Sequence, residues 1–412
     1  NRQDAQKNLV EQFAFTERQA DAILTLQLYR LTNLEITSLQ KELKETEKTI
    51  ATLRAILASE RKLIGVIKGE ISEIRDKYGT DRRSEIQREV EELKVNVEVL
   101  VNAEDVLVTL SNDGYIKRTS RLSYTRSGGE TEPTGLKEGD YLRHLFELNT
   151  LDHLLLFTRK GQCYTLPVHM IPEYKWKENG TAVVNVVPLP KDDRIVSAIP
   201  VKDFNDAGLS VVFVTAQGQV KRTALKEYET NRTSGIVAIK LAAGDEVVRA
   251  HLSDGRKEIL LVTKLGMSIR FHEHEVSPMG RAAAGVRGIQ LKEGDAVAEA
   301  LWVEGEEGEI LVVSDLGYVK SSLLLDYNIQ ARGGKGLHTF EFKEGKRVKP
   351  NGTRLVRAFF VKESYMLTAV ADSGATYTFS TEAAPIEDRK SPGKPVVPLK
   401  KSETLVDVVK PT

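Results

Sequence analysis

The stretch Val106–Thr119, VLVTLSNDGYIKRT, decides what most of this chain is predicted to fold into. It reads as one strand through Val108, a turn at Asp113-Gly114, and a second strand that ends in Lys117-Arg118. Apolar residues that alternate on both sides of an Asp-Gly pair are a strong short-range signal for two paired strands. The stretch is therefore predicted to be a β-hairpin.

The same pattern returns five times further along the chain. The further copies are LLLFTRKGQCYTL (Leu154–Leu166), VVFVTAQGQVKRT (Val211–Thr223), ILLVTKLGMSIRF (Ile259–Phe271), ILVVSDLGYVKSS (Ile310–Ser322) and, more loosely, MLTAVADSGATYTF (Met366–Phe379). The turn glycines are Gly114, Gly161, Gly218, Gly266, Gly317 and Gly374, separated by 47, 57, 48, 51 and 57 residues. Paired strands that recur at roughly 40–50 residues predict propeller-like blades.

Each repeat has a second landmark, a glycine that is predicted to open another strand. These glycines are Gly135, Gly180, Gly235, Gly285, Gly336 and Gly393. An acidic turn such as Leu136–Asp140 or Leu291–Asp295 follows most of them, and then a further strand, seen as Ile195–Ile199, Glu246–Leu252, Ala296–Val303 and Leu355–Val361. A blade therefore has about four strands, and closing six blades into a ring protects most strand edges.

The N-terminal part is predicted to be helical. Thr16 and Gln19 form a capping-box pattern at the start of one helix. From Ile36 to Tyr78 a heptad seam runs through thirteen positions, eleven of them apolar, which predicts a long coiled-coil helix. Its partner helix is expected upstream of Asn1 or in another subunit; the alternative is a helical hairpin that packs on the repeats. The expected domains are residues 1–35, the helix 36–80, a linker 81–100, and the repeats 101–412.

Composition limits the class of protein. The 412 residues are 41% hydrophobic, and of the 59 Lys+Arg and 59 Asp+Glu, 17 of each lie in residues 1–95 and 42 of each in the rest. Any site for a polyanion must therefore come from charge patterning on one surface.

The single cysteine, Cys163, excludes an internal disulfide and suits a reducing compartment. No apolar run reaches the roughly 20 residues of a membrane helix, and the start at Asn1, inside helical sequence, indicates part of a longer protein.

Cations recur at equivalent positions of the repeats. Those at the ends of the hairpins are Lys117, Arg118, Lys221, Arg222, Arg270 and Lys320, and the polar connectors between a hairpin and the second glycine add Arg126, Arg232, Arg281, Arg287, Arg332 and Lys335. Recurrence in register predicts a curved positive track along one rim of the ring, as expected for bound duplex DNA. The alternative is that these cations only solvate strand ends.

The connector Gln330–Gly336, QARGGKG, is the most distinctive of these segments. Gly333, Gly334 and Gly336 would let the backbone approach an anion closely, while Arg332 and Lys335 supply charge. The spacing is not that of a nucleotide-binding Walker A loop. A glycine-rich turn without a ligand is the alternative.

Other candidates are weak. His272 and His274 lie in a predicted surface turn without further metal ligands, and Cys163 lies in a predicted strand without a nearby histidine. Trp176 and Trp302 are isolated, so no stacking platform for single strands is predicted. No catalytic residue is predicted in this sequence.

Taken together, these parts resemble the C-terminal part of the A subunit of bacterial type IIA topoisomerases, the family that includes gyrase A and the A subunit of topoisomerase IV. Phe15–Glu35 is similar to the dimerisation-gate helices of the family, and the heptad helix is similar to one arm of its antiparallel coiled coil. The repeats resemble its six-bladed β-pinwheel, in which blades exchange strands. The resemblance implies a mainly β fold preceded by α-helices.

The distribution of the glycine-rich connector bears on which branch of the family is closer. Gyrase A carries Gln-Arg-Arg-Gly-Gly-Lys-Gly, or a sequence near it, in the first blade. Here the first-blade position, Tyr124–Gly129, keeps only Arg126 and the glycines, and the near match Gln330–Gly336 lies in the fifth blade. The resemblance therefore favours topoisomerase IV, with gyrase-type wrapping for negative supercoiling as the alternative. A propeller scaffold that binds proteins is the alternative of another class.

The resemblance also implies partners and location. The catalytic tyrosine of the family lies outside this sequence, and no cofactor is expected in it, because ATP and Mg²⁺ belong to the partner B subunit. Expected partners are double-stranded DNA, the B subunit of topoisomerase IV, and a second copy of the A subunit in a heterotetramer, without a membrane. The implied role is DNA binding and bending, in the cytoplasm with the nucleoid, for relaxation and decatenation during chromosome segregation.

Overall fold

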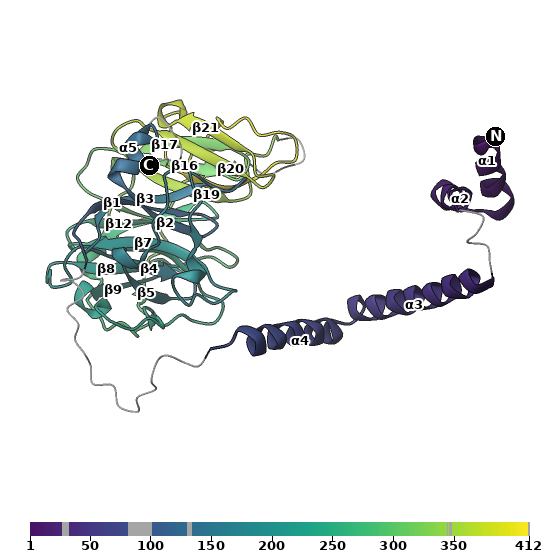
Figure 1. Ribbon diagram of the computed structural model, residues 1–412. Coiled ribbons are helices and arrows are strands. Elements are labelled where there is room, and N and C mark those ends of the chain that lie inside the picture. Colours follow the sequence, from purple (N-terminus) through teal and green to yellow (C-terminus); the bar gives the residue numbers. More distant parts are fainter. Residues whose placement is uncertain (27–32, 81–100, 130–133, 344, 346–347, 411–412) are drawn as a thin grey trace. The chain divides into compact units, whose positions relative to one another are not determined.

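A computed structural model describes residues 1–26, 33–80, 101–129, 134–343, 345 and 348–410 of this chain. The chain divides into two compact units, a helical unit (Asn1–Lys94) and a blade unit (Val95–Thr412) (Figure 1). The expected linker, residues 81–100, lies outside the described residues.

Two short helices open the helical unit, α1 (Arg2–Phe13) and α2 (Glu17–Leu24). The expected capping box starts α2: the backbone N–H of Gln19 donates to Thr16 Oγ1 at 3.3 Å, and the N–H of Thr16 donates to Gln19 Oε1 at 2.8 Å. These bonds satisfy two of the backbone N–H groups that a helix N-terminus leaves without partners.

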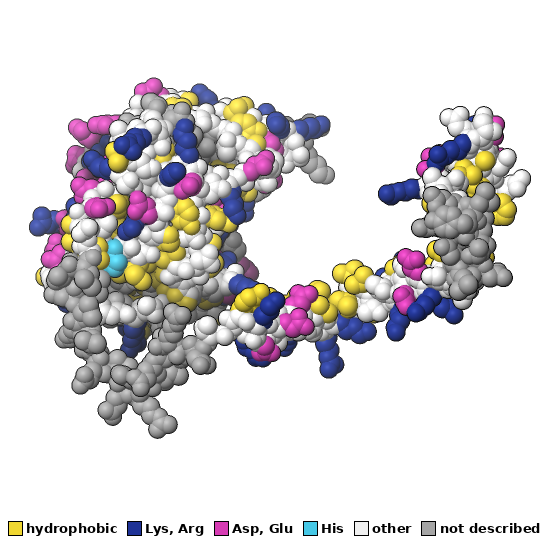
Figure 2. Space-filling model, viewed as in Figure 1, with side chains coloured by type: hydrophobic (Ala, Val, Ile, Leu, Met, Phe, Trp, Pro, Cys, Tyr) yellow, Lys and Arg dark blue, Asp and Glu magenta, His cyan; other side chains and the backbone are white. Residues whose placement is uncertain are grey.

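The heptad region is helical but interrupted. It forms α3 (Asn33–Leu57) and α4 (Glu60–Tyr78), so the prediction of one continuous helix is wrong at Ser59, whose backbone is extended with φ −137° and ψ 108°. The seam residues remain exposed in this chain; Leu53 is 54% and Ile71 60% accessible. Figure 2 shows hydrophobic side chains along both helices. The expected coiled-coil partner stays a prediction.

The blade unit is built from strands β1 to β23 and one-turn helices. The first strands of the hairpins are β1 (Asp105–Ser111), β4 (His153–Thr158), β8 (Ser210–Thr215), β12 (Glu258–Thr263), β16 (Glu309–Ser314) and β20 (Met366–Ala371). The second strands are β2 (Tyr115–Ser120), β5 (Gln162–Pro167), β9 (Gln219–Ala224), β13 (Met267–His272), β17 (Tyr318–Leu323) and β21 (Thr376–Ser380). The strands after the acidic turns are β3 (Leu142–Asn149), β7 (Ile195–Val201), β11 (Val247–Ser253), β15 (Val297–Val303), β19 (Leu355–Val361) and β23 (Leu405–Val409).

Five very short strands and several single helical turns complete the described part of the unit. The strands after the second glycines are β6 (Thr181–Ala182), β10 (Ile236–Val237), β14 (Val286–Arg287), β18 (Leu337–His338) and β22 (Lys394–Pro395). The helical turns are α5 (Arg121–Arg126), η4 (Val168–Met170), η5 (Val183–Asn185), η6 (Leu225–Tyr228), η7 (Glu273–Glu275), η8 (Leu324–Asp326) and η9 (Thr381–Ala383).

The strands assemble into six sheets by exchange between successive repeats. The sheet orders are A (β3-β1-β2-β6), B (β7-β4-β5-β10), C (β11-β8-β9-β14), D (β15-β12-β13-β18), E (β19-β16-β17-β22) and F (β23-β20-β21). Each short strand comes from the repeat after the one that supplies the other three strands. The predicted six-bladed β-pinwheel is confirmed. The strand expected after Gly135 is absent from the described residues there, and sheet F has three strands.

The turn glycines mark the points at which one repeat meets the next. Gly218 has φ +78°, and a Cβ there would lie 2.8 Å from Ile289 Cγ2 and 3.1 Å from the carbonyl oxygen of Ile289. The N–H of Gly288 donates to the carbonyl oxygen of Gly218 at 2.8 Å. At Gly374, in sheet F, a Cβ would meet no other atom within 4 Å among the described residues, in keeping with the three strands of that sheet.

The sheets pack face to face around a common axis. The strands β3, β7, β11, β15, β19 and β23 each lie at one end of their sheet, and successive members contact one another, so they form the inner wall. Five buried hydrophobic clusters of the described residues each join two successive sheets, from A and B to E and F. Because the central strands are covered on both faces, segments such as Val211–Val214 are continuously apolar.

Sheets F and A meet instead through polar side chains near the axis. Asp407 on β23 accepts hydrogen bonds from Tyr141 Oη at 2.6 Å and from Arg143 on β3 at 2.8 Å. Arg357 bridges Asp407 at 2.6 Å and Glu299 at 2.8 Å, and Glu299 also pairs with Arg249. An alternating chain of charges therefore runs from sheet C to sheet A.

Candidate nucleic-acid interface

The connectors between hairpins and short strands lie on the outer edge of the blade unit. Each short strand pairs with the second hairpin strand of the preceding sheet, at the end of the sheet opposite the inner wall. The connectors themselves touch the same strands, as at the bridges Arg118–Glu173, Arg222–Pro278 and Arg270–Ile329. They were expected along one rim of the ring; strand exchange places them on its circumference.

Three of the expected DNA-contacting lysines are buried. Lys117, Lys221 and Lys320 have exposed fractions of 1%, 0% and 0%. Lys117 Nζ donates to the carbonyl oxygens of Trp176 and Glu178, at 2.6 and 2.5 Å, and burial lowers its pKa to about 8 despite the raising effect of Glu178. An ammonium group enclosed in this way cannot reach a phosphate. The prediction that Lys117, Lys221 and Lys320 contact DNA directly is therefore wrong.

The other two lysines repeat this arrangement in later sheets. Lys221 donates to the carbonyl oxygens of Ala238 and Arg281, and Lys320 to those of Asp388 and Arg389, at 2.7 and 2.6 Å. Burial lowers the pKa of each to about 8. These lysines recur in register because each donates at least one hydrogen bond to a backbone carbonyl in the connector of the next repeat. These bonds hold that connector against the sheet that contains the lysine.

The arginines on the hairpin strands are also engaged. Arg270 is 7% exposed; its guanidinium pairs with Glu258 at 2.5 Å and donates to the carbonyl oxygens of Leu324 and Tyr327. Arg118 is half-buried and donates to the carbonyl oxygen of His169, and Arg222 is half-buried as well. The prediction that Arg270 contacts DNA directly is therefore also wrong, because its guanidinium is buried and bonded within the protein.

The segment Gln330–Gly336 is a tightly packed connector. Arg332 Nε donates to the carbonyl oxygen of Glu275 at 3.0 Å, and the backbone N–H of Arg332 donates to the Glu275 carboxylate at 3.0 Å. Gly333 and Gly336 have φ of +81° and +74°, and a Cβ on Gly336 would lie 2.3 Å from the carbonyl oxygen of Ser268. Chain geometry and packing thus already require these glycines, whether or not an anion binds.

Four of the expected connector cations are exposed. They are Arg126 at the end of α5, Arg232, Arg287 on β14, and Lys335. Arg281 is half-buried and donates to the carbonyl oxygen of Glu227 at 3.2 Å. On the face drawn in Figure 2, Lys and Arg side chains are interspersed with Asp and Glu. The exposed cations among the expected site residues are therefore fewer than the sequence indicated, and they lie on the connectors.

The acidic turns have a structural role at the hairpin ends. Asp140, Asp193, Asp245 and Asp295 each accept a hydrogen bond, at 2.9 to 3.1 Å, from a backbone N–H of the hairpin turn in the same repeat. Their carboxylates are thereby held at the turns, while the cations lie on the connectors.

The remaining candidates form no reactive group among the described residues. Cys163 is buried, and burial raises the pKa of its thiol. His272 and His274 stack with ring centres 5.0 Å apart, and the described residues contain no cluster that could hold a metal ion. Trp176 packs against Tyr124 and Trp302 against His251, both within the protein.

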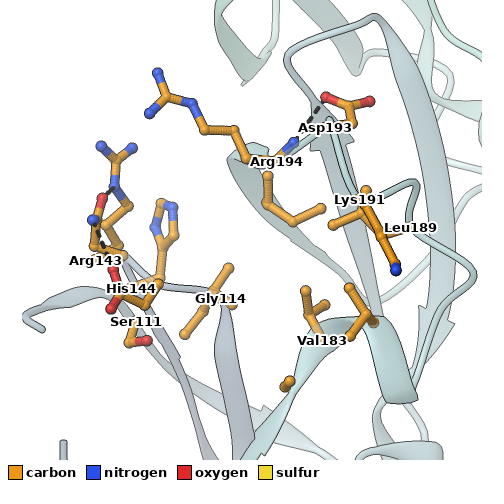
Figure 3. A pocket seen from close by; sticks show the side chains of 15 residues that line it. Ser111, Gly114, Arg143, His144, Val183, Leu189, Lys191, Asp193 and Arg194 are labelled. Carbon is orange, nitrogen blue, oxygen red and sulfur yellow. Dashed lines mark hydrogen bonds between the residues drawn. The ribbon is translucent and has the colours of Figure 1, made fainter. Parts of the chain in front are cut away.

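A cavity of about 250 Å³ opens between the first two repeats (Figure 3). Arg143 and His144 line one side, and Val183, Leu189 and Arg194 line the other. Arg143 is already bound by Asn112 at 3.0 Å and by Asp407. Burial, with Arg249 and Arg143 nearby, lowers the pKa of His144 to about 4, so it is neutral at physiological pH.

The axial charge network was missed by sequence reasoning. Four of its members, Arg249, Glu299, Arg357 and Asp407, each occupy the same register position, immediately after an irregularity in the pairing of their strand. The fifth member, Arg143, lies one residue before that position in β3. A charged residue within an otherwise apolar strand after the acidic turn is the signal that could have identified them. Their pairing depends on contacts between different repeats.

Comparisons with known proteins agree with this architecture. The family described as "DNA gyrase C-terminal domain, beta-propeller" matches residues 105–128, 152–202, 210–254, 257–301 and 308–348. The family of the A subunit of DNA gyrase and topoisomerase IV matches residues 1–72.

Individual relatives extend the match over nearly the whole chain. The A subunit of DNA topoisomerase 4 from Bacillus subtilis (strain 168) is 38% identical over 394 residues, 95% of this chain and 48% of that protein. Its counterpart from Staphylococcus aureus (strain MRSA252) is 38% identical over 362 residues, 88% of this chain and 44% of that protein. The chain thus spans about half the length of these relatives.

Solved structures give the same fold. A crystal structure of the C-terminal domain of DNA topoisomerase IV superimposes with a TM-score of 0.69 at 35% identity, covering 75% of this chain and 94% of that one. The structure of a DNA gyrase A C-terminal domain superimposes with a TM-score of 0.56 at 23% identity, covering 74% of this chain and 99% of that one. The described residues contain no helix long and apolar enough to cross a membrane.

Proposed function

Because this chain belongs to the A-subunit family of DNA gyrase and topoisomerase IV, we propose that its blade unit binds duplex DNA along the connectors on its outer edge. The observation that carries the proposal is the exposure of Arg232, Arg287 and Lys335 on those connectors, while the in-register lysines are buried. Arginine and lysine side chains on a convex edge suit contacts with successive phosphates, which carry no sequence information.

Of the two branches of the family, topoisomerase IV is better supported than gyrase A. The relatives quoted above are topoisomerase 4 A subunits, and the likeness to the topoisomerase IV domain holds at 35% identity. The gyrase A domain, at 23% identity, supports the fold alone. The first-blade segment Tyr124–Gly129 also lacks most of the gyrase-type box.

In the whole enzyme this part would act as a DNA-geometry sensor. It would bend the duplex that flanks the cleaved segment and bias which crossings are captured for ATP-dependent relaxation and decatenation during chromosome segregation. Bending a site of 20–30 base pairs costs on the order of 1–6 kcal/mol, so several phosphate contacts are needed to offset it. ATP and Mg²⁺ would act on the B subunit, in a heterotetramer of two A and two B subunits in the cytoplasm with the nucleoid.

Salt dependence of binding tests the DNA proposal directly. The chain should bind a short duplex with log K falling by about 0.9 for each phosphate contacted per unit of log salt. A flat salt response, or no binding at low salt, would contradict the proposal and favour a protein-binding scaffold.

A topology assay separates the two branches of the family. Joined to its upstream part and supplied with a B subunit, the chain should support relaxation and decatenation. Net introduction of negative supercoils would instead assign it to the gyrase branch.

A further inference from the structure

The charge on the outer edge is not evenly distributed among the connectors. Residues 276–290 carry Arg281 and Arg287, residues 327–340 carry Arg332 and Lys335, and neither segment contains Asp or Glu. By contrast, the connector of the second repeat carries Glu173 and Glu178, and that of the sixth carries Glu387 and Asp388 beside its cations. The equivalent segments of the first and third repeats, residues 126–140 and 226–240, also contain acidic residues, so the acid-free connectors are those of two consecutive repeats, the fourth and the fifth.

These two connectors are joined into one surface. The N–H of Gly333 donates to the carbonyl oxygen of Gly288 at 2.6 Å, and the N–H of Gln290 donates to that of Gly334 at 2.8 Å. A guanidinium nitrogen of Arg332 donates to the carbonyl oxygen of Arg287 at 3.1 Å. The relative position of the two segments is therefore set by direct hydrogen bonds between them.

The cations of this paired surface fall into two kinds. Arg281 and Arg332 are half-buried and bonded to Glu227 and Glu275, each through both backbone and side chain. The side chains of Arg287 and Lys335 are exposed and have no ion-pair partner among the described residues. Two charges are thus free for an external anion on a scaffold that the other two arginines hold in place.

Both segments contain several small residues. Gly280, Ala282 and Ala284 are exposed in the first segment, and the second contains Ala331, Gly333 and Gly334. Small side chains let a rigid polyanion approach the backbone closely.

We infer that duplex DNA contacts this paired connector surface, residues 276–290 and 327–340, more strongly than the rest of the circumference. The inference rests on the proposed function and sharpens it: the sequence predicted a track around the ring, whereas the structure assigns the main phosphate contacts to the outer edges of sheets C and D. DNA held by a short arc can bend across it without following the whole ring.

Paired double variants of the full chain test the inference. Arg287→Ala with Lys335→Ala removes the two free cations, and Lys175→Ala with Lys390→Ala removes two exposed cations from the connectors of the second and sixth repeats. On a 30-base-pair duplex at about 0.1 M salt, the first variant should bind about 10-fold more weakly or worse. Its log–log salt slope should be smaller by about 1.8, from 0.9 per lost phosphate contact.

The controls separate this inference from the proposed function. The second double variant should bind within about twofold of the unmodified chain, and Arg287→Lys, which keeps the charge, should retain the salt slope. Equal losses in both double variants would mean that contacts run around the ring, which overturns the inference and leaves the proposed function intact. Absence of salt-dependent binding by the unmodified chain would overturn the proposed function itself.

Discussion

Replacing Asp407 with alanine tests how the last blade is held to the first. Asp407 is 7% exposed and accepts hydrogen bonds from Arg357, Arg143 and Tyr141 at 2.6, 2.8 and 2.6 Å. Removal of one partner from a buried ion pair costs about 3–5 kcal/mol, because the remaining charge stays desolvated. We expect the lower end, about 3 kcal/mol, since Arg357 keeps Glu299 and the partly exposed Arg143 can be hydrated.

The pH dependence of the same variant follows from the sign of the pKa shift. Burial alone would raise the pKa of Asp407, but Arg357 and Arg143 outweigh it and hold the pKa below its ordinary value. The ionised carboxylate therefore contributes stability that is fully present above the unfolded-state pKa of about 3.9 and is lost as pH falls through the lower folded-state pKa. The difference between the original chain and Asp407→Ala should shrink as the pH drops below about 4.

Urea unfolding followed by tryptophan fluorescence is the assay. The chain has two tryptophans, Trp176 and Trp302, and both lie in the blade unit, so the helical unit does not contribute to the signal. The matched control is Glu147→Ala, which breaks an ion pair with Arg121 at 68% exposure and should change the unfolding free energy by about 0.5 kcal/mol or less. A loss under about 1 kcal/mol for Asp407→Ala, or one equal to the control, would refute the reasoning.

Three further experiments probe the repeats themselves, two with substitutions and one with a thiol reagent. Gly218→Ala should destabilise the blade unit by about 1–3 kcal/mol more than Gly244→Ala in the same urea assay, because both glycines have positive φ but only Gly218 faces Ile289 at 2.8 Å. Lys221→Met should lower the unfolding free energy by about 1–3 kcal/mol by leaving two buried carbonyls without a donor, while DNA affinity of the folded protein, measured by fluorescence anisotropy, stays within about twofold; a selective loss of affinity would contradict its buried role. Cys163 should resist a thiol reagent at pH 8 until the chain is unfolded, because burial raises its pKa; rapid labelling of the folded protein would disprove this.

Recurrence in register was a sound guide to the architecture but not to exposure. Lys117, Lys221 and Lys320 recur because the same structural bond is made in several sheets, and a sequence pattern cannot tell a lysine that bonds carbonyls from one that faces solvent. Gly135 shows the opposite case. It has the register of a strand-opening glycine, but its N–H donates to the carbonyl oxygen of Trp176, and no strand follows it in the described residues.

The sequence by itself determined the hairpins and the turn glycines, because each depends on residues that lie within one repeat. The recurrence of these motifs along the chain, together with the N-terminal helices, indicated the repeat number and the family. Only the tertiary structure decided which sheet receives each short strand, which cations are free, and what joins sheet F to sheet A. The physical reason is that Arg287 and Lys335, or Asp407 and Arg143, lie in different repeats. Their neighbours are set by strand exchange and by the packing of the sheets in the ring, and neither can be predicted from the sequence of a single repeat.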